Sequence, residues 1–135
     1  MDLNDLKTLI LRVFAERIIS IVIFGSYAKG LSTPESDIDI LLILEDKVNY
    51  EDYEKFFLKI EMPLTEKYGL IKLSPVIRCT DNISEKTSIL WDESNIILYD
   101  KDNFFSNIIS KIKDLKENNS IIGIQFPNSH YLIRE

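Results

Sequence analysis

The spacing of apolar and polar residues predicts amphipathic helices that flank a few buried strands. Three segments repeat apolar residues every three or four positions, as helices with one buried face do: residues 2–17, 50–67 and 104–118. Four segments are short and mostly apolar, as expected of strands: residues 18–24, 37–44, 70–79 and 95–99. A further short helix is predicted over residues 84–91, where Asn82 or Ser84 could cap it.

Proline and glycine predict where these elements end or change. Pro63 lies inside the second long helix and is expected to bend it, and Gly69 is expected to close it. Pro75 cannot donate a backbone hydrogen bond. The strand over residues 70–79 is therefore predicted to lie at an edge of the sheet or to carry a bulge.

The most informative stretch joins the first two strands and reads Gly25-Ser26, ten residues, then Asp37-Ile38-Asp39. One or two helical turns are predicted over residues 27–31, followed by a polar loop over residues 32–36. Side chains two apart in a strand point to the same face, so the two aspartates are predicted to lie together. A soluble domain has little structural reason to begin a buried strand with two carboxylates on one face.

These residue types in this order suit a site for a phosphate and a divalent metal. Glycine lets a phosphate approach the backbone closely, and the Ser26 hydroxyl can donate a hydrogen bond to it. Two carboxylates on one strand can hold Mg²⁺ between them and the same phosphate group. Each part is weak evidence alone, because Gly-Ser pairs are common and Asp-x-Asp pairs are usually solvated. The alternative is a polar turn with two exposed acids.

Composition narrows the class of protein and its setting. The 135 residues are expected to form one domain, residues 1–135, and no apolar run reaches the roughly 18 residues of a membrane span. The acidic N-terminus lacks the features of a secretion signal and Cys79 is the only cysteine, so we expect a cytoplasmic location. The net charge of −6 argues against long nucleic acid as a ligand. A single metal-bound nucleotide stays compatible with that charge.

The segment Gly25-Ser26-Tyr27-Ala28-Lys29-Gly30, followed by Ser36-Asp37-Ile38-Asp39-Ile40-Leu41, resembles the signature of the DNA polymerase β-like nucleotidyltransferases. Within that superfamily it is most similar to the minimal nucleotidyltransferases of prokaryotes. The resemblance implies an α/β (α+β) fold, with a mixed β-sheet flanked by helices. It also implies Mg²⁺ as the cofactor, and transfer of a nucleoside monophosphate from a nucleoside triphosphate, first of all ATP, to an acceptor hydroxyl.

Site residues and a partner follow from the same resemblance. By position, Asp37 and Asp39 would be the catalytic pair and ligate the metal, and Gly25 and Ser26 would contact the donor phosphates. Many members pair with a small helical HEPN protein as a toxin–antitoxin module. The resemblance therefore implies a HEPN-like partner, to which the transferase can add AMP as an antitoxin.

Other polar residues are weaker candidates. Lys29 lies one turn beyond Ser26 and could reach a phosphate, although a solvated lysine is as compatible with the pattern. Ser36 could orient Asp37 or, as we favour, cap the polar loop; it stays a nucleotide-binding candidate with Lys29. Lys72 and Arg78 could neutralise a triphosphate, but exposed strand charges are the favoured interpretation. His130 has no second histidine or cysteine near it, so no zinc site is expected.

The chain departs from the family pattern at one position. Active members usually carry a third carboxylate on a later strand, but residues 70–79 contain no acid, and Ser74 stands about where the acid is expected. Three explanations stay open: a base supplied by the substrate, recruitment of a nearby acid such as Asp81, or binding of a nucleotide without transfer. The competing hypotheses are thus a Mg²⁺-dependent transferase, a non-catalytic nucleotide-binding antitoxin, and a domain whose acids only solvate a turn.

Overall fold

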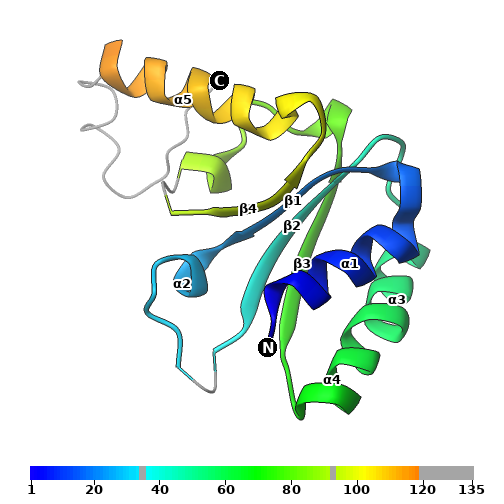
Figure 1. Cartoon of the computed structure of the whole chain (residues 1–135). Helices are drawn as coiled ribbons and strands as arrows, with labels where there is room; N and C mark the ends of the chain where they lie inside the picture. Colours follow the sequence, from blue (N-terminus) through cyan, green and yellow to red (C-terminus); the bar gives the residue numbers. More distant parts are fainter. Residues whose placement is uncertain (34–35, 92–93, 119–135) are drawn as a thin grey trace.

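A mixed β-sheet forms the centre of the computed structural model, which describes residues 1–33, 36–91 and 94–118 (Figure 1). Within these ranges the sheet has four strands, in the order β3-β2-β1-β4. They are β1 (Ile18–Phe24), β2 (Ile38–Leu44), β3 (Leu73–Cys79) and β4 (Ile96–Asp100). β1 is antiparallel to β2 and β4, whereas β2 and β3 are parallel. The predicted fold, a mixed sheet flanked by helices, is confirmed.

Helices cover both faces of this sheet (Figure 1). The α-helices are α1 (Leu3–Phe14), α2 (Gly25–Ala28), α3 (Tyr50–Phe56), α4 (Met62–Tyr68) and α5 (Phe104–Asn118). α1, α3 and α4 share one hydrophobic core with the sheet, to which they contribute Phe14, Phe56 and Leu64. α5 belongs to a second core on the other face, with Phe105 and Ile112. Alternate residues of β1 and β2 enter the two cores, so both strands are buried on both faces, as the apolar run over residues 18–24 predicts for β1.

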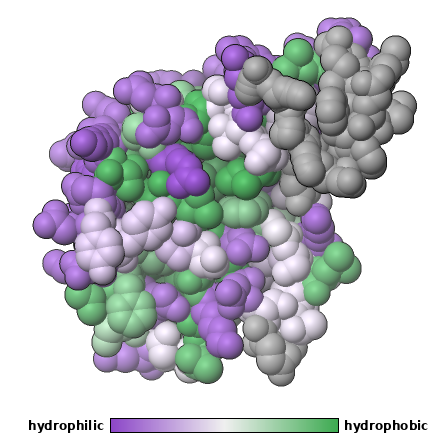
Figure 2. Space-filling view, turned by 180° about the vertical axis from the view of Figure 1, so that it is seen from behind, coloured by the Kyte–Doolittle hydropathy of each residue, from purple (hydrophilic) through white to green (hydrophobic). Residues whose placement is uncertain are grey.

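On the side of the molecule turned away in Figure 1, some hydrophobic residues are exposed at the surface (Figure 2). Hydrophobic residues gather in the middle of that surface, with hydrophilic residues around them (Figure 2). Several members of the second core, among them Phe24, Val76 and Ile89, are only partly buried. A surface with apolar residues in its middle and polar residues around it can receive another molecule.

The long helix predicted over residues 50–67 forms, but with an interruption. A π-helical turn (Phe57–Glu61) separates α3 from α4, immediately before Pro63. Pro63 has no N–H, so it cannot complete the α-helical hydrogen bond of the residue four positions earlier, and the helix changes its pairing there. Gly69 ends the helix as predicted, with a positive φ of 89° and its N–H donating to the Thr65 carbonyl at 2.9 Å.

The strand β3 lies at an edge of the sheet, as Pro75 predicts, and side chains cover its outer backbone. Leu73 donates its backbone N–H to the Glu61 carboxylate at 3.3 Å. Ile77 donates its backbone N–H to the Tyr53 hydroxyl at 2.9 Å. Pro75, between these two, has no N–H to donate. We call this arrangement the closed edge of β3.

Three predicted elements differ in extent from those observed. Residues 84–91 form only a 3₁₀ turn, Ser88–Trp91, because the Thr87 hydroxyl accepts the Ser84 N–H at 3.0 Å and competes with helical pairing. The helical turn after β1 begins at Gly25 and not at Tyr27. The edge strand begins at Leu73, where its pairing with β2 begins, and not at Leu70.

Within the described ranges, no helix has the length and apolar character that a membrane crossing requires. His130 and the predicted tail beyond residue 118 lie outside the described residues.

Candidate functional site

The two halves of the Gly-Ser and Asp-x-Asp motif meet in space. β1 ends at Phe24, which pairs with Asp39 of β2, and α2 begins at the next residue, Gly25. A Cβ built on Gly25 would lie 3.1 Å from Cγ of Asp39 and nearer still to its Oδ2. The glycine backbone therefore lies directly against the carboxylate. The sequence pattern did not predict this contact, although the antiparallel pairing of two consecutive strands is the signal that could have indicated it.

The electrostatics of Asp39 distinguish it from an ordinary surface acid. Its side chain is partly buried, and this burial raises the pKa of Asp39 above its usual value. The negative charge of Asp37 raises that pKa further. Among the described residues, no hydrogen bond or ion pair reaches either carboxylate. The pair thus concentrates negative charge at the start of β2, and carboxylate oxygens are ligands that Mg²⁺ prefers.

Ser26 and Lys29 lie on the turn that follows β1. Ser26 lies in the short helix α2, and its carbonyl accepts the Leu31 N–H at 2.9 Å. Lys29 follows α2 and is exposed, with its backbone N–H donating to the Gly25 carbonyl at 3.2 Å. These bonds fix the turn after β1, so that Ser26 and Lys29 follow Gly25 on one compact segment.

Ser36 closes the polar loop that leads to β2. Its hydroxyl accepts the Thr33 N–H at 2.9 Å and lies 3.1 Å from the Thr33 hydroxyl. This is the capping arrangement favoured from the sequence over an interaction with Asp37. Ser36 therefore acts on the shape of the loop in this structure.

Ser74 occupies the place next to Asp39 on the neighbouring strand. The two residues are register partners in the parallel pairing of β2 and β3, so their side chains point to the same face. β3 contains no acid, and no group of three or more metal-binding side chains occurs in the described part of the chain. A serine thus stands where the third carboxylate was expected.

Lys72 lies at the Asp39 end of β3, where its carbonyl accepts the Ile38 N–H at 2.9 Å, and its side chain is exposed, whereas Arg78 and Asp81 lie away from this point. Cys79, the last residue of β3, pairs with Leu44, five residues beyond Asp39 and thus about 17 Å along the strand. Asp81 follows Cys79 and lies at that far end, so its recruitment is ruled out in this structure. Arg78 is also close to that end and exposed, as the favoured interpretation expected.

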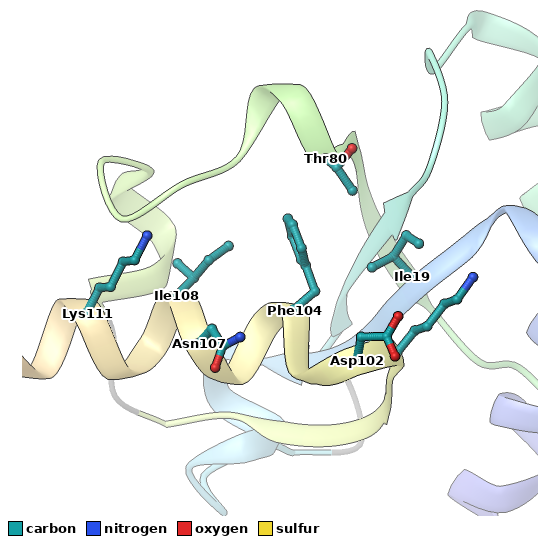
Figure 3. Close-up of a pocket in the computed structure, with 8 residues that line it drawn as sticks. Ile19, Thr80, Asp102, Phe104, Asn107, Ile108 and Lys111 are labelled. Atoms are coloured by element: carbon teal, nitrogen blue, oxygen red, sulfur yellow. The ribbon is translucent and has the colours of Figure 1, made fainter.

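A separate hollow of about 370 Å³ lies at the same far end (Figure 3). Its lining residues come from β1, α5 and the turns before α5 and after β3: Ile19, Thr80, Lys101, Asp102, Phe104, Asn107, Ile108 and Lys111. No residue of the Gly-Ser and Asp-x-Asp motif is among them. The hollow is therefore distinct from the candidate site.

The fold and the motif define a class of protein, and sequence comparison names its family. The profile of the nucleotidyltransferase domain matches residues 6–121, so the chain belongs to the nucleotidyltransferase domain family. A candidate protein adenylyltransferase of Methanocaldococcus jannaschii is 33% identical over 109 residues, which cover 76% of this chain and 72% of that protein. Membership of this family makes the chain a nucleotidyltransferase, as the motif resemblance implied.

Solved structures share the fold. A toxin–antitoxin complex with AMP-PNP contains a chain that superposes with a TM-score of 0.57 at 19% identity, covering 93% of this chain and 98% of that one. A Shewanella oneidensis complex of a tri-AMPylated HEPN toxin with its MNT antitoxin gives a TM-score of 0.50 at 17% identity, with the same two coverages. At such identities the likeness concerns the fold alone.

Proposed function

We propose that this chain transfers AMP from ATP to a hydroxyl group of a protein partner, with Mg²⁺ as cofactor. The observation that carries the proposal is the Asp37–Asp39 pair, in which Asp39 lies against Gly25 and neither carboxylate has a hydrogen-bond or ion-pair partner among the described residues. A protein acceptor is supported by the M. jannaschii relative, which is named for protein adenylylation. A HEPN-type toxin as that protein is supported by the S. oneidensis complex.

In the proposed reaction, the acceptor oxygen forms a bond to the α-phosphorus of ATP, the bond to pyrophosphate breaks and the hydroxyl proton is released. Asp37 and Asp39 would hold the metal, and Gly25 and Ser26 would lie against the donor phosphates. When bound, Mg²⁺ supplies positive charge that stabilises the phosphate oxygens. Lys29 and Ser36 would border the same site, the lysine as a second positive charge and the serine through the loop that it closes.

The acceptor proton is the step for which this chain provides least. Ser74 cannot serve as a general base as a carboxylate would, and loss of such a base costs about 10²–10⁴-fold in rate. Slow transfer is therefore expected, with the proton leaving to water or to a substrate group. The same observation favours a second candidate function, in which the chain binds a nucleotide and neutralises a HEPN-type partner by contact alone.

Labelled ATP separates these functions. The chain is incubated with Mg²⁺, α-labelled ATP and the protein encoded by the adjacent gene, and the Asp39→Asn variant serves as the control. Label on the partner that depends on Asp39 supports the transferase. A stable complex without label supports the contact-only antitoxin. If no label, no complex and no nucleotide binding are observed, both functions are contradicted. The two acids would then be solvated residues of a turn.

A further inference from the structure

Three glycines of the described chain share one backbone conformation but differ in surroundings. Gly25, Gly30 and Gly69 have positive φ values of 71°, 74° and 89°. This left-handed region disfavours any residue with a side chain, so replacement of any of the three glycines by alanine introduces a similar backbone strain. A Cβ built on Gly30 or Gly69 meets nothing within 4 Å. Only at Gly25 does the space beside the glycine matter as well.

The three atoms nearest to a Cβ built on Gly25 all belong to the side chain of Asp39. A Cβ at position 25 would lie 3.1 Å from Cγ and 3.4 Å from Cβ of Asp39, with Oδ2 nearer than either. The backbone of Asp39 cannot shift easily, because it pairs with Phe24 on one side and Ser74 on the other. Relief of the clash therefore requires rotation of the Asp39 side chain, which would move its carboxylate relative to Asp37.

We infer that Gly25 is a positioning residue for Asp39: its missing side chain is what allows the carboxylate to lie where it can share a cation with Asp37. This inference rests on the proposed function in taking the two acids as metal ligands. It assigns the glycine a role beyond the approach of a phosphate to the backbone. The two roles are separable, because the positioning of Asp39 affects metal binding before any nucleotide is bound, whereas the approach of a phosphate affects nucleotide binding.

The first test measures metal binding without nucleotide. Mn²⁺ is titrated into the protein and its free concentration is followed by electron paramagnetic resonance. Gly25→Ala is expected to raise the dissociation constant at least 10-fold, whereas Gly30→Ala, which carries the same backbone strain, is expected to change it less than 2-fold. Ser26→Ala is expected to weaken ATP binding and leave Mn²⁺ binding unchanged. Normal Mn²⁺ binding by Gly25→Ala together with weakened ATP binding would overturn the inference.

A second test needs neither metal nor activity. Thermal unfolding is compared for Gly25→Ala in the wild-type chain and in an Asp39→Ala background, both in EDTA. Gly25→Ala should lower the Tm more in the wild-type chain than in the Asp39→Ala background, because only in the wild-type chain does the new Cβ meet a carboxylate. If Gly25→Ala alone does not fold, recovery of folding in the double variant supports the same conclusion. Equal losses in the two backgrounds would overturn the inference. A wild-type chain that binds no Mn²⁺ but shows the coupling would contradict the proposed metal site and leave the contact established.

Discussion

Asp39 is partly buried and Asp52 almost completely, and the two carboxylates have opposite surroundings. Asp52 in α3 is 2% exposed and receives two hydrogen bonds from the Arg17 guanidinium, at 2.8 and 3.1 Å. These bonds hold the pKa of Asp52 below its usual value, and the Asn49 N–H adds to the effect. Asp39 receives no such bond in the described part of the chain, and its pKa is raised.

Asp100 follows the pattern of Asp52. Burial alone would raise the pKa of Asp100, but hydrogen bonds from the Ser20 hydroxyl, the Phe105 and Ser106 N–H groups and the Ser106 hydroxyl outweigh it and lower that pKa. Asp100 thus ties β1 to the start of α5. The comparison teaches that Asp52 and Asp100 have hydrogen-bond partners that support structure, whereas Asp39 has none among the described residues, as the proposed metal site requires.

Replacement of Asp39 should have the largest effect on activity and little on stability. Asp39→Asn is expected to lower adenylyl transfer by about 10³-fold, because the site loses a charged metal ligand. In EDTA its free energy of unfolding should equal or exceed that of the wild type, since the substitution removes the repulsion between two neighbouring carboxylates. Label transfer and chemical denaturation measure the two quantities. Strong destabilisation would show that Asp39 has a structural role like that of Asp52.

Replacement of Arg17 should lower stability and leave activity nearly unchanged, the opposite of what is expected for Asp39. Arg17→Ala leaves the buried Asp52 carboxylate without its cation, and we expect a loss of about 3 kcal/mol in the free energy of unfolding. Activity per folded molecule should stay close to that of the wild type. Asp46→Asn removes the other, 60% exposed partner of Arg17 and should cost less than about 1 kcal/mol. Equal losses in the two variants would contradict a distinct role for the buried pair.

A carboxylate added at position 74 should increase activity, as expected of an acid that belongs to the site and not to the structural pairs. Ser74→Asp places a third acid beside Asp39 and is expected to raise the rate of transfer by roughly 10–100-fold, within the range of general-base effects. Ser74→Asn, which has the same shape without the charge, should not raise it. Single-turnover label transfer provides the measurement. An equal rate in both variants would argue that the acceptor proton does not limit the reaction.

The smallest expected effect is the pH dependence that Asp100 gives to stability. Its folded pKa is lowered, so its ionised form stabilises the fold above the unfolded pKa of about 3.9, and this contribution is lost as the pH falls through the folded value. The free energy of unfolding of the wild type should exceed that of Asp100→Asn by about 1–2 kcal/mol at pH 7, and the difference should shrink as the pH falls below about 3.9 and through the folded pKa. Urea unfolding across this range tests it; a constant difference would exclude ionisation as its cause.

The fold was largely predictable from the sequence because its signals are local. Helical periodicity, two isoleucine-rich runs and the edge position of Pro75 each reflect a rule that acts within about ten residues. The contact between Gly25 and Asp39 was not predictable in the same way, because it depends on how β1 pairs with β2. The network around Asp100 was missed for a similar reason: its partners Ser20 and Ser106 come from different elements.

Part of the candidate site was predicted and part needed the fold. The two acids and the Gly-Ser turn were recognisable from residue types and spacing alone. The remoteness of Asp81 needed the parallel register of β2 and β3, which no residue pattern encodes directly. The same register identifies Ser74 as the neighbour of Asp39 on β3, whereas the sequence alone placed it there only approximately.

The closed edge of β3 limits how this molecule can polymerise. Strand addition at that edge is disfavoured, because Glu61 and Tyr53 already bind the outward N–H groups and Pro75 has none. At most the β4 edge stays available for pairing with another strand. Two copies that pair through the same β4 edge would form a closed two-fold pair, because neither copy then has a second edge of this kind for a third. Tyr53 of α3 and Glu61 of the adjoining π-helical turn therefore hinder strand pairing at the β3 edge of the folded sheet.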